Sequence, residues 1–291
     1  MTDQNNALQK FRENIDDLDN QILDLLCQRI DIVKQVGEFK RNAGMSGSII
    51  RPGREAVMVR SVTERMHPDF PKAAIAQIWR MIISGAINVE ENARVSTVSR
   101  DSSEDCYWLA REYFGPFTPT EERPSGIDVL HDVRSGHATI GVLPLWESHV
   151  PSAWWSRIAE EHADLKIFAT LPFIRTAYSS KVPLVSIGHV KPEATGNDES
   201  LWVLSAEERV QFTALESYLV QHGLEYAFLG SCRVMNVPTQ HHYLVKIIGF
   251  VDGSNTSMQK AIEGMNSQHS RPDCPVNGHH LGSYAVPMLC S

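Results

Sequence analysis

The sequence predicts a multidomain protein with an all-α N-terminal domain, a small α/β region after it, and an α+β module at the C-terminal end. Apolar residues recur at helical spacing through the first third of the chain, which predicts helices with one buried face. Strands and helices then alternate from about residue 95, which is typical of an α/β fold. A length of 291 residues accommodates two or three such units.

The first predicted element is a helix of more than thirty residues that begins near residue 7. Its apolar residues follow one another at three- and four-residue steps: Leu8, Phe11, Ile15, Leu18, Ile22, Leu25, Leu26, Ile32, Val33 and Val36. The first glycine in it is Gly37, and Asn42 to Gly44 form a stop signal. Because one helix cannot bury such a stripe alone, we expect it to pack against helices of a second chain in a homodimer.

Two further helices complete the predicted N-terminal domain, residues 1–95. Pro52 and Pro71 stand where these helices would begin, since proline suits the first turn of a helix. The third helix carries apolar residues at helical spacing from Ile75 to Ile87. Three helices per chain are therefore expected.

The α/β region is predicted over residues 96–205. Helices are expected at Trp108–Phe114 and Ile127–Val133, and Trp154-Trp155 is expected to pack against the core. Strands are expected around residue 95 (ARVSTVS), at Ile140–Leu145, Leu165–Phe173, Val182–Gly188 and Ser200–Ser205. The stretch Lys191–Glu199 contains Pro, Gly, Asn and Asp, which indicates a loop or linker.

The C-terminal module is predicted over residues 206–291. A helix at Ala206–His222 precedes a strand at Tyr226–Leu229, and a longer strand follows at Tyr243–Asp252. A second helix, from Thr256 to about Gln268, leads to a terminal strand near Gly282–Val286. With Ser200–Ser205 as a first strand that is hard to separate from this module, the order is that of a ferredoxin-like fold.

Composition and charge limit the classes of function that are open to this chain. The net charge is −8, yet residues 1–95 hold 13 Lys and Arg against 13 Asp and Glu, so the acidic excess lies in the rest of the chain. This argues against nucleic acid as a partner and directs the search for an anion site to the helical part. Apolar runs stay well below the roughly 20 residues of a membrane span. With a polar first segment and five cysteines without paired spacing, we expect a cytoplasmic protein with reduced thiols.

Three cations of the first predicted helix are candidates for binding a ligand. Arg29 and Lys40 are three turns apart and share a face, whereas Arg12 stands roughly 26 Å from Arg29 and faces another direction. One small ligand could therefore meet Arg29 and Lys40 of one chain, but Arg12 only from another chain or at another site. The usual alternative for such residues is a solvated helix surface.

The helical segments resemble a known family. LQKFRENIDDLDNQILDLLCQRIDIVKQVGEFK, RPGREAVMVRSV and IWRMIISGAINVEE are similar to the all-helical chorismate mutase domain, and the resemblance covers nearly all of residues 7–95. The motifs are specific: R-x-x-I-D-x-L-D, then Q-R, then V-G-x-x-K, and R-P-x-R-E at the second helix. The resemblance implies an interlocked dimer in which each active site takes one arginine from the other protomer.

The resemblance also implies roles for individual residues. Arg29, Lys40, Arg54, Glu55 and Glu90 would line the site of one chain, and Arg12 would come from the other. Chorismate is a dianion that rearranges to prephenate as its ether bond breaks, so catalysis needs positioning and positive charge at the ether oxygen. Arg12 and Arg29 suit the two carboxylates, Lys40 and Glu90 the ether oxygen, and Glu55 the substrate hydroxyl. Neither a metal nor a cofactor is implied.

Three positions depart from the pattern of some family members. Glu90 stands where some have glutamine, and a carboxyl group donates a hydrogen bond only when protonated, so we expect activity to fall as the pH rises. Ala86 replaces a serine and Arg51 replaces an aspartate, so one or two auxiliary hydrogen bonds are expected to be lost.

The rest of the chain resembles the bifunctional chorismate mutase–prephenate dehydratases. GHATIGVLPLWES is similar to a dehydratase stretch, with Pro144 to Ser148 at its end, and HHLGSYAVP is similar to the last strand of the amino-acid-binding ACT domain. The glycine-rich opening of the dehydratase is absent, and the nearest text to its Thr-Arg-Phe segment is Ser200 to Trp202. The stretch between Ser148 and Ser200 is too short for a second α/β lobe.

We therefore expect a chorismate mutase, an isomerase of phenylalanine and tyrosine biosynthesis, with a shortened dehydratase-like region and an ACT-like tail for regulation by an aromatic amino acid. The alternatives are a true bifunctional enzyme and a non-catalytic regulator that binds chorismate or an aromatic amino acid. An aminated chorismate as substrate also stays open. Cys274 with His279-His280 matches no standard zinc pattern, so no metal site is expected.

Overall fold

The computed structural model describes most of the chain. The described residues are 2–44, 50–90, 92–99, 106–145, 153–161, 163–177, 179, 183–208, 210–234, 237–269 and 274–290. Glu147 and Ser148, at the end of the dehydratase-like stretch, lie outside them.

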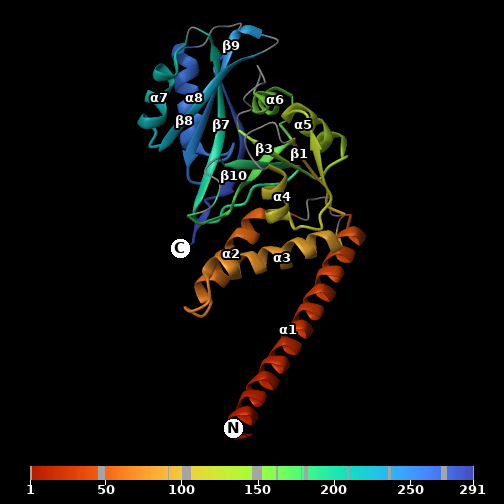
Figure 1. Ribbon diagram of the computed structural model, residues 1–291. Helices are drawn as coiled ribbons and strands as arrows, with labels where there is room; N and C mark the ends of the chain where they lie inside the picture. Colours follow the sequence, from red (N-terminus) through yellow and green to blue (C-terminus); the bar gives the residue numbers. More distant parts are fainter. Residues whose placement is uncertain are drawn as a thin grey trace.

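The N-terminal part is helical, as predicted. Its three helices are α1 (Thr2–Asn42), α2 (Pro52–Arg65) and α3 (Lys72–Glu90). The helix α2 packs on α3, and the C-terminal part of α1 contacts α3 (Figure 1). The rest of α1 extends away from the molecule as a straight rod with the N-terminus at its far end (Figure 1).

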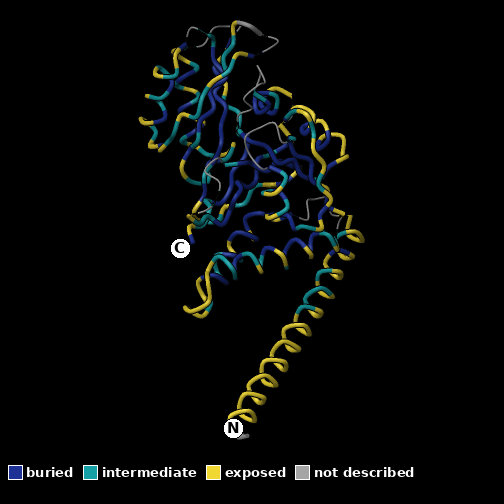
Figure 2. Tube along the Cα trace, viewed as in Figure 1, coloured by how far each residue is buried: buried dark blue, intermediate teal, exposed yellow. Residues whose placement is uncertain are grey.

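The apolar stripe of α1 lies in solvent in the single chain. Phe11 is 64% exposed and Leu25 is 63% exposed, and most of the rod is exposed in Figure 2. Full burial of a large apolar side chain contributes about 1.5–3 kcal/mol of stability. The stripe is therefore a strong candidate for contact with other helices.

The α/β region begins with three parallel strands. Its elements are β1 (Val95–Val98), α4 (Cys106–Phe114), β2 (Thr120–Arg123), α5 (Gly126–Ser135) and β3 (Ile140–Pro144). The strand β1 lies between β2 and β3 and is parallel to both. The helix α5 begins after Ser125, which accepts a hydrogen bond from the Asp128 amide, and ends at the left-handed Gly136. The helices α4 and α5 correspond to the two predicted helices of this region.

The next segment extends the sheet in the antiparallel sense. It contains α6 (Trp154–Glu161), β4 (Lys166–Leu171), the short β5 (Ile174–Arg175) and β6 (Leu184–Gly188). The strand β6 is antiparallel to both β3 and β4. Trp154 and Trp155 are fully buried, as predicted, because both lie on the face of α6 that joins the core.

The last part of the chain is an antiparallel four-stranded layer with two helices. Its elements are β7 (Asp198–Glu207), α7 (Phe212–Gln221), β8 (Tyr226–Val234), β9 (Val237–Ile248), α8 (Thr256–His269) and β10 (Asn277–Ala285). The strand order is β10-β7-β9-β8. The helices α7 and α8 contact each other and cover the same face (Figure 1).

Residues 206 and 207 belong to a strand, where the sequence predicts the start of a helix. Ala206 pairs with His241 and Glu207 with Gln240 in the ladder between β7 and β9. The helix therefore begins at Phe212, and the predicted domain limit at residue 206 falls inside β7. The ladder overrides local helix propensity because β9 supplies hydrogen-bond partners that the sequence does not reveal.

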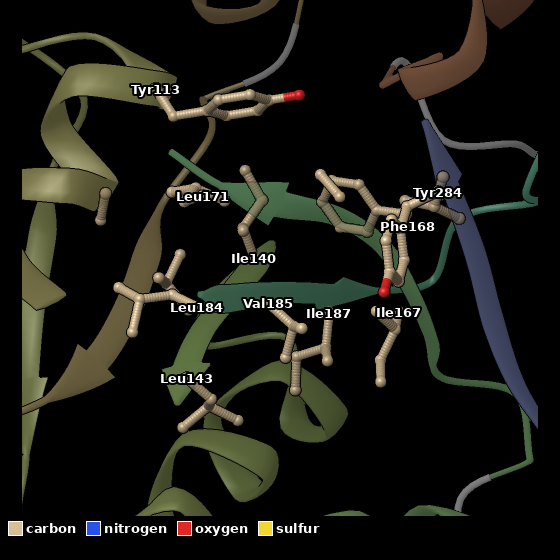
Figure 3. Packing of buried hydrophobic residues seen from close by; sticks show 14 of the residues in the cluster. Tyr113, Ile140, Leu143, Ile167, Phe168, Leu171, Leu184, Val185, Ile187 and Tyr284 are labelled. Carbon is tan, nitrogen blue, oxygen red and sulfur yellow. The ribbon is translucent and has the colours of Figure 1, made fainter. Parts of the chain in front are cut away.

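The two parts share one nine-stranded sheet, because β10 pairs in parallel with β4 at Gly282 and Ile167. A Cβ atom at Gly282 would lie 1.9 Å from the carbonyl oxygen of Ile167, so only glycine permits this approach. Figure 3 shows part of the core around the sheet, where Tyr284 of β10 lies beside Ile167 and Phe168 of β4. The short β11 (Met288–Leu289) pairs with β5.

Candidate active site

A hollow lies between the C-terminal half of α1, the first turns of α2 and the C-terminal half of α3. Its volume is about 520 Å³, within the range of small-ligand sites. Apolar side chains of the three helices form its walls, among them Ile32, Val36, Met58, Ile83 and Ile87. The hollow therefore combines an apolar lining with the polar groups described next.

Five of the six predicted site residues line this hollow. Arg29 and Lys40 come from α1, Arg54 and Glu55 from α2, and Glu90 from α3. Arg12 does not line it and is exposed on the rod of α1. This separation follows from the helix geometry, because 17 residues of continuous helix carry Arg12 away from Arg29.

The spacing of the residues along each helix explains why they meet. Arg29, Val36 and Lys40 are separated by whole turns of α1 and so lie on one face. Gly37 is buried where α1 crosses α3, and a Cβ atom there would lie 3.7 Å from Cγ of Glu90. The close crossing of the two helices brings Lys40 to Glu90.

Lys40 and Glu90 form an ion pair at the rim of the hollow. Lys40 Nζ lies 3.7 Å from Glu90 Oε2, which is longer than a hydrogen bond. The Glu90 side chain is only 11% exposed. Glu90 Oε2 and Arg29 Nη1 are buried atoms without a hydrogen-bond partner in the structure. Buried polar atoms in proteins are normally paired, so these two are available to a polar ligand.

Glu55 is held from two sides. Its Oε1 accepts a hydrogen bond from the backbone N–H of Arg51 (3.1 Å), and its Oε2 accepts one from Arg80 Nη1 (2.9 Å). A carboxylate offers about four lone-pair positions, so Glu55 can still accept a hydrogen bond from a ligand hydroxyl. Its orientation is set before any ligand arrives.

Arg80 connects this carboxylate to the α/β region. The Arg80 side chain is 2% exposed, and its Nη2 donates to the backbone oxygen of Tyr113 at 3.0 Å. Its guanidinium also lies 3.7 Å from the centre of the Tyr113 ring, a cation–π contact. Burial raises the pKa of the Tyr113 hydroxyl, which keeps that ring neutral.

Arg80 is not among the residues predicted for the site. Ala76, Arg80, Ile83 and Ile87 are spaced at helical intervals on the buried face of α3, and Arg80 is the charged member of that face. A cation on an apolar stripe is a signal for a buried partner.

Arg51 also lines the hollow, so the replacement of aspartate by arginine adds a positive charge there. Its guanidinium pairs with Glu193, 142 residues away. A contact over this distance in the chain cannot be predicted from the neighbouring residues. Ala86 lines the hollow with a methyl group and adds no hydrogen-bond donor.

The charges of the hollow favour an anion. Arg29, Lys40, Arg51 and Arg54 face the carboxylates Glu55 and Glu90. The two carboxylates and the partly apolar wall leave a net positive site of small volume, which suits a compact dianion.

Comparison with known proteins assigns the helical part to a class. Residues 11–91 match the family model of chorismate mutase type II, and these residues form a chorismate mutase type II domain. The matched segment spans α1 from Phe11 through α2 and α3, and it includes every residue of the hollow.

Curated relatives with longer chains match about half of this chain. The bifunctional chorismate mutase/prephenate dehydratase of Aquifex aeolicus (strain VF5) is 29% identical over 143 residues, which is 47% of this chain and 38% of that protein. The protein of the same description from Neisseria gonorrhoeae is 26% identical over 137 residues, 47% of this chain and 36% of its own length. The chain thus spans about two fifths of the length of these relatives.

Two solved structures align with about two thirds of this chain. A prephenate dehydratase from Streptococcus mutans aligns with 67% of this chain and 98% of its own, at 12% identity and a TM-score of 0.48. A prephenate dehydratase from Arthrobacter aurescens in complex with L-Phe aligns with 68% of this chain and 93% of its own, at 11% identity and a TM-score of 0.48.

Among the helices that the structure describes, none has both the length and the apolar character needed to cross a membrane. Within the same described residues, no group of three or more His, Cys, Asp or Glu side chains is arranged to hold a metal ion.

Proposed function

We propose that this protein is a chorismate mutase that converts chorismate to prephenate in the hollow between α1, α2 and α3. The observation that carries the proposal is the meeting of Arg29, Lys40, Arg54, Glu55 and Glu90 around one small cavity inside a chorismate mutase type II domain. The prephenate would serve phenylalanine and tyrosine biosynthesis in the cytoplasm.

Substrate binding rests on the arginines. Arg29 binds one carboxylate of chorismate through its guanidinium, whose Nη1 has no hydrogen-bond partner in the free protein. Arg54 adds positive charge from the first turn of α2. Glu55 accepts a hydrogen bond from the substrate hydroxyl and is held for this by Arg51 and Arg80.

Catalysis rests on Lys40 and Glu90. As the ether bond of chorismate breaks, negative charge develops on the ether oxygen, and donors fixed at that position lower the barrier. Lys40 supplies an ammonium donor, and Glu90 supplies a second donor when its carboxyl group is protonated. Because the two groups are already neighbours, both can reach the same oxygen.

A second copy of the chain completes the site. The exposed stripe of α1 needs a partner surface, and the same rod carries Arg12. In a homodimer with the rods laid against the partner, Arg12 of one chain would bind the second carboxylate in the hollow of the other. An isologous contact between two α1 stripes buries the apolar stripe of both chains at once.

The rest of the chain serves regulation and structure in this proposal. We divide the chain into the mutase domain at 1–95, a shortened dehydratase-like region at 96–205 and an ACT-like module at 206–291, to which β7 adds the first strand. The strand order β10-β7-β9-β8 with α7 and α8 on one face is that of a ferredoxin-like fold and supports the module. An aromatic amino acid is the proposed effector.

The relatives of matching description favour one alternative, a bifunctional enzyme that also dehydrates prephenate. One assay separates the two functions. Loss of chorismate absorbance is followed with the purified chain, and the product is tested for phenylpyruvate before and after acid treatment. Prephenate without phenylpyruvate at neutral pH supports a monofunctional mutase, and phenylpyruvate at neutral pH supports the bifunctional enzyme.

Variants locate the activity. Arg29→Ala and Lys40→Ala should each lower kcat/KM by at least about a hundredfold, because each loses a charge-assisted contact with the charge of the transition state. Lys34→Ala, which removes an exposed cation of the same helix outside the hollow, should leave the rate unchanged. Wild-type protein without turnover between pH 5 and 8 would instead favour a regulator that binds chorismate.

A further inference from the structure

The N-cap residue of α2 does not cap the helix with its own side chain. Arg51 occupies the N-cap position and makes no side-chain capping hydrogen bond. The first N–H groups of a helix lack partners within the helix, and a carboxylate there is favoured by the helix dipole. Glu193 occupies this position, and its Oε2 accepts a long hydrogen bond from the backbone N–H of Arg54 at 3.4 Å.

Glu193 holds the side chain of Arg51 as well. Its Oε1 accepts hydrogen bonds from Nε of Arg51 at 3.0 Å and from Nη2 of the same guanidinium. Gly53 permits this approach, since a Cβ atom on Gly53 would lie 2.6 Å from Cβ of Glu193 and 2.8 Å from its backbone oxygen. The Glu193 carboxylate thus bonds to the Arg51 guanidinium and the Arg54 amide, and the Cβ atom and backbone of Glu193 lie close to Gly53.

The segment that carries Glu193 is itself fixed. We name Glu193–Asp198 the α2 platform. Asp198 is buried and accepts hydrogen bonds from the amides of Thr195 and Gly196 and from the Thr195 hydroxyl. Arg60, two turns further along α2, donates to Thr195 Oγ1 at 2.9 Å and to the backbone oxygens of Asn197 and Val286. The helix is therefore attached to the platform at two points.

We propose that Glu193 is a positioning residue of the chorismate pocket. It caps α2 and holds Arg51, and in this way it sets Arg54 and Glu55 in their places. The inference rests on the proposed function and extends it, because it makes substrate affinity depend on a residue outside the mutase domain. The α2 platform continues directly into β7, so the C-terminal module and the pocket share this connection.

The competing explanation is that Arg51 and Glu193 form only a surface ion pair, without an effect on the pocket. An exposed Arg–Glu pair contributes little to stability and nothing to a distant site. The pair of Arg233 and Glu208 in the C-terminal module is of that kind, with side chains 69% and 40% exposed, and neither residue lines the hollow. Glu208→Ala is therefore the matched control.

The experiment measures kcat and KM for chorismate in the full chain with Glu193→Ala, Glu193→Gln and Glu208→Ala. Loss of a helix cap is worth roughly a five- to tenfold change, so Glu193→Ala should raise KM by about that factor with kcat within about twofold. Glu193→Gln keeps an acceptor for the Arg54 amide and loses the charge, so its KM should lie between those of wild type and Glu193→Ala. Glu208→Ala should match the wild type.

Hydrogen exchange of the α2 amides gives a second readout that does not need turnover. Glu193→Ala should speed exchange in the peptide that contains Gly53 to Glu55 by about fivefold and leave the amides of α8 unchanged. An active wild type together with an unchanged KM in Glu193→Ala overturns the proposal. A wild type without turnover overturns the proposed function instead, and the exchange rates then still support or overturn the capping of α2 by Glu193.

Discussion

Arg80 and Glu55 form a buried ion pair that ties the mutase site to the α/β region. Arg80 Nη1 lies 2.9 Å from Glu55 Oε2, with side-chain exposures of 2% and 10%. The same guanidinium donates to the Tyr113 backbone oxygen. One residue of α3 thus orients a group of the hollow and anchors α3 on α4.

Arg80→Ala is expected to destabilise the protein by about 3–5 kcal/mol, because it leaves the Glu55 carboxylate buried without its charged partner. Urea unfolding followed by circular dichroism measures the change. Arg157→Ala, which removes an ion pair at the surface of α6, is the control and should cost less than about 1 kcal/mol. A loss as small for Arg80 as for Arg157 would contradict this role of the buried pair.

Glu90 is expected to make the mutase rate depend on pH. Only the protonated carboxyl group donates a hydrogen bond, so the wild-type rate should fall as the pH rises. Glu90→Gln donates through its amide at every pH, so its rate should stay flat between pH 5 and 8. Rate profiles of the two proteins decide the matter, and identical profiles would exclude Glu90 as the donor.

Arg12 is expected to act across a dimer, which predicts complementation. Arg12→Ala and Lys40→Ala should each be inactive alone, since each lacks one group in every site. In a dimer of the two variants one site has both substitutions and the other has neither. Mixing equal amounts under exchange should therefore restore about a quarter of the wild-type sites. No recovery, with dimer exchange verified by mass, would show that Arg12 does not act in the partner's site.

Buried histidines in the C-terminal module predict loss of stability in acid. Burial, together with the nearby His279 and His241, lowers the pKa of His242 from 6.5 to about 4. Its ring bonds to Ser156 (2.9 Å), and the carboxylate of Glu160 lies 3.8 Å away. Burial and Lys166 lower the pKa of His280 to about 4 as well.

The sign of the effect follows from proton uptake. Between pH 6.5 and 4 the unfolded chain binds protons at these histidines that the folded chain does not, so stability falls as the pH falls through this window. For the fully buried His242 the loss is on the order of 3 kcal/mol. His242→Asn should flatten the dependence of the unfolding free energy on pH, and the exposed His131→Asn should not. Equal pH slopes in wild type and His242→Asn would contradict the assignment.

Local pattern was enough for most of the elements. The stripe of α1, Pro52 at the start of α2, Pro71 before α3, and the apolar runs of β3 and β4 each predicted the element in which they lie or which they precede. Positions 206 and 207 were misassigned, since a ladder partner decides between strand and helix where propensity does not. Residues that contact distant parts of the chain, Arg80 and Glu193, carried little or no local signal.

The sequence by itself determined the helical spacing that places Arg29 and Lys40 on one face and keeps Arg12 away from them, because a continuous helix has a fixed rise and turn. It also determined the positively charged side chains, arginine and lysine, that a dianion needs for binding. Only the tertiary structure decided that α2 and α3 bring Arg54, Glu55 and Glu90 to that face. Only the tertiary structure, too, decided that Glu193 of the α/β part contacts Arg51 and that Arg80 of α3 contacts Tyr113 of α4. Contacts between residues far apart in the chain depend on how whole elements pack, and packing is a property of the folded chain.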